Sequence, residues 1–211
     1  MDSSCFLSQN NNIYIITTNY NEGNSEPIKI FDLNGQKINK INISNIITFF
    51  IDTYYDIILS KYYIITGNSN YSKSYEYNEN NLYHKYIDKS EYLIKSIIIK
   101  NNKGIIKLLE SSKDGIIRIF NFHSGLLLNK IQICKYRLCG MCLWNDNYLF
   151  VGCGDKTIKI VEIKNGLIFK SLTSHNRYVL TIKKIIHPEY GECLISQNME
   201  ESEIKLWVNK I

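Results

Sequence analysis

Short stretches in which hydrophobic and polar residues alternate follow one another along most of the chain, with turn-forming residues between them. Residues 137–172 show this arrangement most clearly. There, Ile158 and Ile160 alternate with Lys159, which is the two-residue period of a β-strand. Asn, Asp and Gly, which favour tight turns, separate the stretches. The pattern predicts four strands joined by turns, over residues 137–144, 148–153, 157–163 and 167–172.

The same order of segments recurs along the chain with a nearly constant period. A motif of β-formers around a polar residue, ending in an aromatic residue or Val, occurs at residues 28–31, 72–75, 117–120, 158–161 and 204–207. The ends of these motifs are 44, 45, 41 and 46 residues apart, which is typical of the four-stranded blades of a β-propeller. We therefore expect an all-β fold of about five four-stranded antiparallel blades. They would form one propeller domain or fragment over residues 1–211, with blades at approximately residues 3–43, 47–88, 93–133, 137–172 and 179–208.

The composition agrees with a fold made of strands. The 211 residues include 37 Ile and 16 Tyr but no Ala, and β-branched and aromatic residues favour strands whereas Ala favours helices. The net charge is only +5, from 25 basic and 20 acidic residues, and just three of the basic residues are Arg. Because Arg leads in contacts to phosphates and base edges, this modest excess of Lys argues against dedicated binding of nucleic acid.

The sequence shows no signal for export or for insertion into a membrane. Residues 1–12 have no basic start and no apolar stretch of signal length. The longest apolar runs are far shorter than the ~20 residues that span a bilayer. Six Cys at irregular spacings are typical of free thiols inside the cell. We therefore expect an intracellular protein, cytoplasmic or nuclear, without a membrane partner.

The unit that covers residues 175–207 resembles a WD repeat, the building unit of G-beta-like β-propellers. It has His175 before its first strand, Ser196 in its second strand and Trp207 at the end of its third strand. In that family, a His, a Ser or Thr, a turn Asp and the Trp form a hydrogen-bonded set that joins the strands. The resemblance therefore implies structural roles for these three residues.

Two further units carry the turn Asp of the WD-repeat pattern. Asp114 and Asp155 each lie six residues before the end of a repeated motif, and the resemblance implies a structural role for both. No unit contains all four members of the family's set, and Glu201 stands at the Asp position of the last unit. The WD dipeptide itself is absent, because Val208 follows the only Trp at that position.

The resemblance also bears on how complete the propeller is. Rings in the WD-repeat family commonly have seven blades, which need roughly 300 residues. Their last blade usually receives its outer strand from the opposite end of the chain. Here the last unit ends with its third strand, and only three residues precede the first strand. We expect an open or incomplete propeller that is completed by a second chain, by self-association or by further sequence. A closed ring of five blades is the alternative.

No motif of the chain predicts catalysis or the binding of a metal or cofactor. Cys139 and Cys142 have the spacing of metal-binding or redox pairs, but residues three apart on one strand point to opposite faces. Residues 152–157 faintly resemble a phosphate-binding loop, but such a loop begins a helix and this one precedes a predicted strand. No His accompanies a nucleophile in a recognisable motif. We therefore expect no catalytic, cofactor-binding or metal-binding residues, and hence no enzyme.

Exposed loop positions are the remaining candidates for function. Alignment of the units places Tyr92, Arg137 and Tyr178 just before a first strand, with Tyr136 and Arg177 beside them. Tyr and Arg are among the residues most enriched at hot spots of protein interfaces. The chain is therefore expected to be a non-enzymatic scaffold or adaptor for other proteins. Two alternatives stay open: a subunit of a nucleic-acid-associated (ribonucleoprotein) complex, and a substrate receptor of a ubiquitin-ligase complex.

Overall fold

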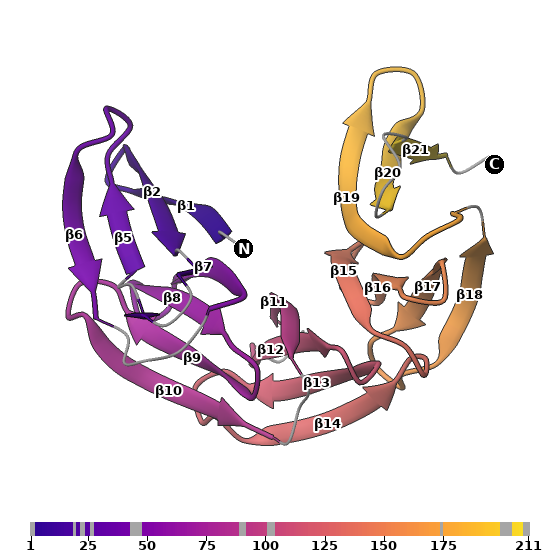
Figure 1. Cartoon of the computed structure of the whole chain (residues 1–211), viewed down its shortest axis with the longest axis horizontal. Coiled ribbons are helices and arrows are strands. Elements are labelled where there is room, and N and C mark those ends of the chain that lie inside the picture. Colours follow the sequence, from indigo (N-terminus) through magenta and orange to yellow (C-terminus); the bar gives the residue numbers. More distant parts are fainter. Residues whose placement is uncertain are drawn as a thin grey trace. The chain divides into compact units, whose positions relative to one another are not determined.

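The regular structure of this chain consists of β-strands. The structure is a computed structural model that describes residues 3–18, 20–21, 24–25, 28–42, 48–88, 92–100, 104–173, 175–198 and 204–208. In this part of the chain there is no helix, and hence none that could cross a bilayer. The strands form four sheets of four strands, one sheet of three strands and one two-stranded hairpin (Figure 1). The predicted all-β fold of propeller blades is confirmed.

The first two sheets use residues 3–87. Sheet 1 consists of β1 (Ser3–Gln9), β2 (Asn12–Thr18), β5 (Ile28–Phe31) and β6 (Lys37–Ile41). Between β2 and β5, the short strands β3 (Tyr20–Asn21) and β4 (Asn24–Ser25) form a hairpin that the sequence pattern did not predict. Sheet 2 consists of β7 (Phe50–Asp56), β8 (Lys61–Gly67), β9 (Tyr71–Glu76) and β10 (Asn81–Ile87).

The other three sheets use residues 93–207. Sheet 3 consists of β11 (Leu93–Lys100), β12 (Ile106–Ser112), β13 (Ile116–Asn121) and β14 (Leu127–Gln132). Sheet 4 consists of β15 (Leu138–Leu143), β16 (Tyr148–Cys153), β17 (Thr157–Glu162) and β18 (Ile168–Thr173). Sheet 5 consists of β19 (Val179–His187), β20 (Gly191–Asn198) and β21 (Ile204–Trp207).

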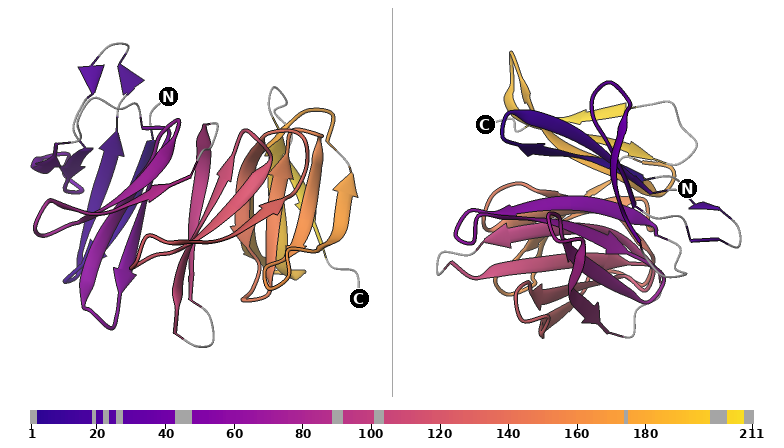
Figure 2. Two further views of the ribbon diagram at one scale, coloured as in Figure 1. Left: turned by 90° about the horizontal axis from the view of Figure 1, so that it is seen from below. Right: turned by 90° about the vertical axis from the view of Figure 1, so that its left-hand side faces the viewer.

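In each of these five sheets the strands lie side by side in chain order, with the β3–β4 hairpin apart from sheet 1. Figure 2 shows the sheets from two further sides. The strands of sheet 4 begin and end within one residue of the predicted bounds. Two of the three turns between them use left-handed backbone, with φ of +72° at Lys156 and +74° at Gly166, as expected for tight turns rich in Gly, Asn and Asp. The hydrophobic period and the turn residues together determine this topology.

The chain divides into two compact units. The first contains residues 1–93 and the turn segment 123–126, and the second contains residues 94–122 and 127–211. The expectation of an open propeller depends on how these units are placed, and it stays a prediction.

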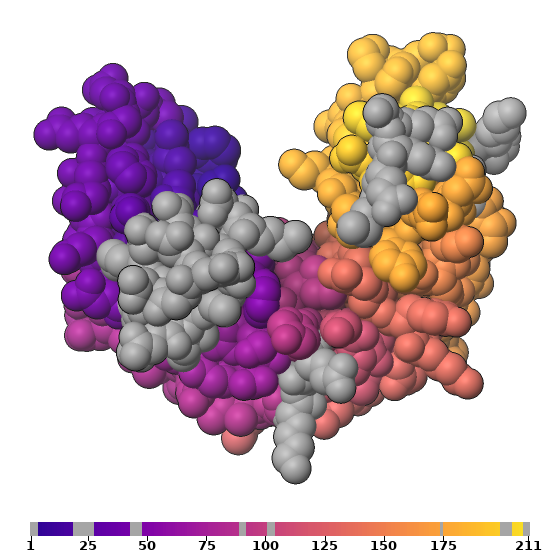
Figure 3. All heavy atoms as spheres, viewed as in Figure 1, coloured from indigo at the N-terminus to yellow at the C-terminus, as the bar shows by residue number. Residues whose placement is uncertain are grey.

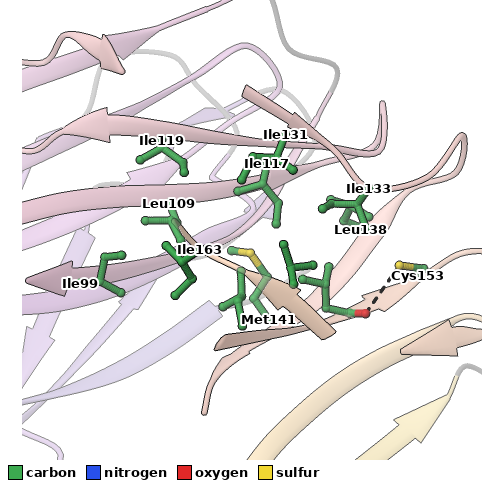
Figure 4. Packing of buried hydrophobic residues seen from close by; sticks show 13 residues of the cluster. Ile99, Leu109, Ile117, Ile119, Ile131, Ile133, Leu138, Met141, Cys153 and Ile163 are labelled. Carbon is green, nitrogen blue, oxygen red and sulfur yellow. Dashed lines mark hydrogen bonds between the residues drawn. The ribbon is translucent and has the colours of Figure 1, made fainter. Parts of the chain in front are cut away.

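Each unit has its own hydrophobic core. In the second unit, aliphatic side chains of sheet 3 pack against those of sheet 4 (Figure 4). Ile117 and Val151 are fully buried. In the first unit, Ile16 and Ile30 of sheet 1 belong to one buried cluster with Ile64 of sheet 2. Burial of one such side chain contributes about 1.5–3 kcal/mol relative to its exposure. Facing sheets therefore stabilise one another through Ile, Leu and Val.

Two glycines allow sheet 5 to approach sheet 4 closely. A Cβ on Gly152 in β16 would lie 2.4 Å from the carbonyl oxygen of Val179, and one on Gly140 in β15 would lie 2.9 Å from that of Leu180. Any other residue would therefore collide with the backbone of β19. Figure 3 shows the orange atoms of sheet 4 next to the yellow atoms of sheet 5.

Candidate interaction surface

Four of the candidate partner-binding residues lie in two loops of the second unit. Tyr136 and Arg137 directly precede β15, and Arg177 and Tyr178 directly precede β19. Tyr136 and Tyr178 are 58% and 40% exposed. Arg177 is also exposed, and Arg137 is half-buried. The first residue of each following strand is buried, so each loop is fixed to the core immediately after its candidate residues.

The two loops lie at the same end of their sheets. The amide nitrogen of Gly154 donates a hydrogen bond of 2.8 Å to the carbonyl oxygen of Arg137, so the first loop borders the end of β16. Gly152, two residues earlier, closely approaches the carbonyl oxygen of Val179 at the start of β19. The second loop therefore borders the same end of β16. The structure thus brings the four candidate residues to one surface of the second unit.

Tyr92 lies in the first unit and precedes β11. Its φ is +50°, and its amide nitrogen donates a hydrogen bond of 2.9 Å to the carbonyl oxygen of Ser69. The ring centroids of Tyr92 and Phe49 are 5.5 Å apart, and Phe49 directly precedes β7. Sequence reasoning missed Phe49, although its position relative to its strand equals that of Tyr92. The first unit therefore has an aromatic pair where the second has Tyr and Arg.

The three WD-like residues of sheet 5 form one hydrogen-bonded set. His175 Nε2 and Ser196 Oγ are 2.7 Å apart, and Trp207 Nε1 donates to the same oxygen at 2.7 Å. His175 and Ser196 are buried. The set joins the loop before β19 to β20 and β21, and it therefore fixes the chain two residues before Arg177. Glu201 lies outside the described residues.

Asp155 lies in the turn between β16 and β17 and binds the start of β17. Its Oδ1 accepts hydrogen bonds from the nitrogen of Thr157 at 3.1 Å and from Thr157 Oγ1 at 2.6 Å. Lys159 Nζ is 3.2 Å from Oδ2. Burial raises the pKa of Asp155, but the hydrogen bonds from Thr157 and Lys159 outweigh it, so the pKa lies below its ordinary value.

Asp114 occupies the corresponding turn of sheet 3, between β12 and β13. It pairs with Arg118, whose two terminal nitrogens lie 2.6 and 3.2 Å from the carboxylate oxygens. Ser112 donates to Asp114 and accepts from Arg118 at 2.6 Å. Arg118 is only 1% exposed. Burial raises the pKa of Asp114, but the hydrogen bonds from Arg118 and Ser112 outweigh it and leave that pKa lowered.

Sequence reasoning missed the basic partners of both turn residues. Arg118 and Lys159 each follow their Asp by four residues. Phe120 and Val161 end the repeated motifs of sheets 3 and 4, at the position that Trp207 occupies in sheet 5. Arg118 and Lys159 each lie two residues before that position. The alternation along the motif suggested a solvent-facing side chain here. The third strand of a blade lies between two others, so its side chains contact the neighbouring strands on both sides.

A buried carboxylate in the first unit was also missed. Asp56 is buried, and its Oδ2 lies 3.0 Å from His123 Nε2. The Nδ1 atom of the same His is 3.0 Å from the hydroxyl of Tyr83. A His between a carboxylate and a hydroxyl is also the arrangement of a general base. Here the contacts fasten the 123–126 segment to sheet 2, and no single motif signals them because the three residues lie far apart in the sequence.

The two Cys residues with Cys-x-x-Cys spacing lie on one strand, as predicted, and both are free thiols. Cys139 is buried and Cys142 is partly buried on β15. The neighbouring Cys153 thiol and the amide of Tyr136 lower the pKa of the Cys134 thiol. The Cys134 thiol and burial in turn raise the pKa of Cys153. Among the described residues, no group of three or more His, Cys, Asp or Glu could hold a metal ion.

Comparison with known proteins finds no relative of this chain among protein-family models or curated proteins. The likeness to WD repeats rests on His175, Ser196 and Trp207, on the two turn Asp residues and on the repeat period. The structure itself shows that the chain is built from the antiparallel blades of a β-propeller.

Proposed function

We propose that this chain is a non-enzymatic scaffold that binds other proteins through the loops before β15 and β19. The observation that carries the proposal is the gathering of Tyr136, Arg137, Arg177 and Tyr178 at one end of sheets 4 and 5. Large Tyr side chains lose little conformational entropy on binding and, with Arg, dominate protein interfaces.

The loops are held in place before any partner binds. The hydrogen-bonded set of His175, Ser196 and Trp207 fixes one loop. The hydrogen bond from Gly154 to Arg137 fixes the other. A surface that is already ordered loses less entropy on association than a mobile one. This pre-organisation supports binding as the role of the loops.

The test compares two variants of the full chain in a pull-down from native cells. Tyr136→Ala/Tyr178→Ala removes the exposed rings of the two loops. Tyr190→Ala removes a similarly exposed ring from the β19–β20 turn, at the opposite end of β19. We expect the loop variant to lose captured proteins that the control retains, with both variants folded by circular dichroism. Equal capture by both variants would refute a role for the loops.

The same experiment separates the alternatives. Captured RNA or DNA that is released by salt would favour a ribonucleoprotein subunit, because phosphate contacts weaken steeply with ionic strength. Captured ubiquitin-ligase subunits would favour a substrate receptor. Either result would replace a general scaffold with a defined complex.

A further inference from the structure

The second unit contains an aromatic pocket that lies outside the loops before β15 and β19. Its volume is about 470 Å³, and sheets 4 and 5 form its walls. Both Trp residues of the chain, Trp144 and Trp207, line it. A volume of this size is within the ~300–1,000 Å³ range of sites that enclose several apolar groups.

The wall from sheet 4 is a continuous row of side chains. Phe150 pairs with Ile160, and Ile160 pairs with Lys170, so the three lie in register across β16, β17 and β18. Residues paired directly across antiparallel strands project from the same face. A register shift between β17 and β18 leaves Phe169 unpaired in the ladder, and its exposed ring also lines the pocket.

The wall from sheet 5 is shorter by one strand. Leu194 and Trp207 pair across β20 and β21 and both line the pocket. Sheet 4 continues to a fourth strand, β18, whose Lys170 and Leu172 line the pocket. Among the described residues, no strand pairs with β21 on its other side. The pocket therefore lies against β18 and beside the outer edge of β21.

An edge strand offers a row of backbone donors and acceptors to an added strand. Lys170 is the one charged residue among those that line the pocket, so an acidic group complements it. Lys184 contacts Trp144, with its Nζ 3.0 Å from the Trp144 carbonyl oxygen and 4.8 Å from the ring centroid. These two contacts hold Trp144 in place without an occupant.

We propose that this pocket binds an extended acidic–apolar segment of a partner protein, which pairs with β21 as a fourth strand of sheet 5. Alternate residues of a strand share one face. An aliphatic residue would therefore enter between Trp144 and Trp207, and an acidic residue two positions away would pair with Lys170. The site shares no residue with the loops before β15 and β19, so either proposal can fail without the other.

The probe is a synthetic heptapeptide with Ile, Glu and Leu at alternate positions and Thr between them. Because both Trp residues of the chain line the site, binding should change the intrinsic fluorescence, and calorimetry on the full chain gives the affinity. We expect saturable binding. No fluorescence change and no heat at peptide concentrations up to ~1 mM would overturn the proposal.

Two matched controls test the mode of binding. A peptide with N-methylated amides keeps its side chains but cannot pair with β21, and its equal affinity would overturn strand addition. Lys170→Glu should weaken binding of the Glu peptide about five-fold and favour a peptide with Lys in its place. Lys183→Glu, an exposed change on β19 outside the pocket, should not. An unchanged preference in Lys170→Glu would overturn the role of Lys170.

Discussion

Sheets 3 and 5 fasten their strands in two different ways. In sheet 5, the neutral hydroxyl of Ser196 lies between His175 and Trp207. In sheet 3, Ser112 lies between Asp114 and the buried Arg118. Where sheet 5 has Trp207, sheet 3 has Phe120, whose side chain has no N–H to donate. Arg118, two positions earlier, supplies the donors instead. An indole or a guanidinium can thus donate the hydrogen bond to the Ser hydroxyl of a repeat, and only the guanidinium carries a charge.

The largest effect is expected from breaking the charged set of sheet 3. Arg118→Met keeps a long side chain but removes the guanidinium that donates to both Ser112 and Asp114. Removal of one partner from a buried ion pair costs about 3–5 kcal/mol, so the free energy of unfolding should fall by that amount in urea denaturation. The matched change in sheet 4, Lys159→Met, affects a more exposed pair and should cost below about 1 kcal/mol. Equal losses of unfolding free energy in the two variants would contradict the idea that burial makes the Arg118 pair the stronger one.

A smaller effect is expected from the set of sheet 5 that is centred on Ser196. Ser196→Ala removes one oxygen that serves both His175 and Trp207. Buried groups left without a partner cost about 1–3 kcal/mol, to be measured by the same denaturation. Gln197→Ala, a change at an exposed neighbour on β20, provides the control. A loss in the control as large as that of Ser196→Ala would show that the hydroxyl has no special role.

The smallest effect is expected from pH, and it concerns the charged set of sheet 3. The pKa of Asp114 is lowered in the folded chain, so its contribution is complete above the unfolded value of about 3.9. That contribution is lost as pH falls through the folded pKa. The stability difference between the wild type and Asp114→Asn should therefore shrink as the pH is lowered from about 5. A similar shrinkage in Asp146→Asn, an exposed control, would assign the effect to net charge instead.

The repeat period predicted the sheets well because it records side chains that must face a core. The two-residue alternation places Ile158 inward, and the turn residues at 154–156 mark where the chain reverses. The β3–β4 hairpin was not predicted because it interrupts the period between two regular strands.

The candidate surface was only partly predictable. Tyr136, Arg137, Arg177 and Tyr178 could be found because their positions relative to the strands repeat. The pairing of Asp56 with His123 could not, because these residues belong to different repeats and contact only after folding. The aromatic pocket is a similar case, since Trp144 follows β15 whereas Phe169 lies on β18.

The meander order of the strands has a consequence for how the chain folds. Each sheet is complete within about 40 residues of sequence, so most strand pairings close short loops and favour fast folding. A ribosome adds residues at roughly 5–20 per second, whereas a β-hairpin forms in about 1–10 μs. Each sheet can therefore pair its own strands during synthesis, before the sheet that will cover its hydrophobic face has been made.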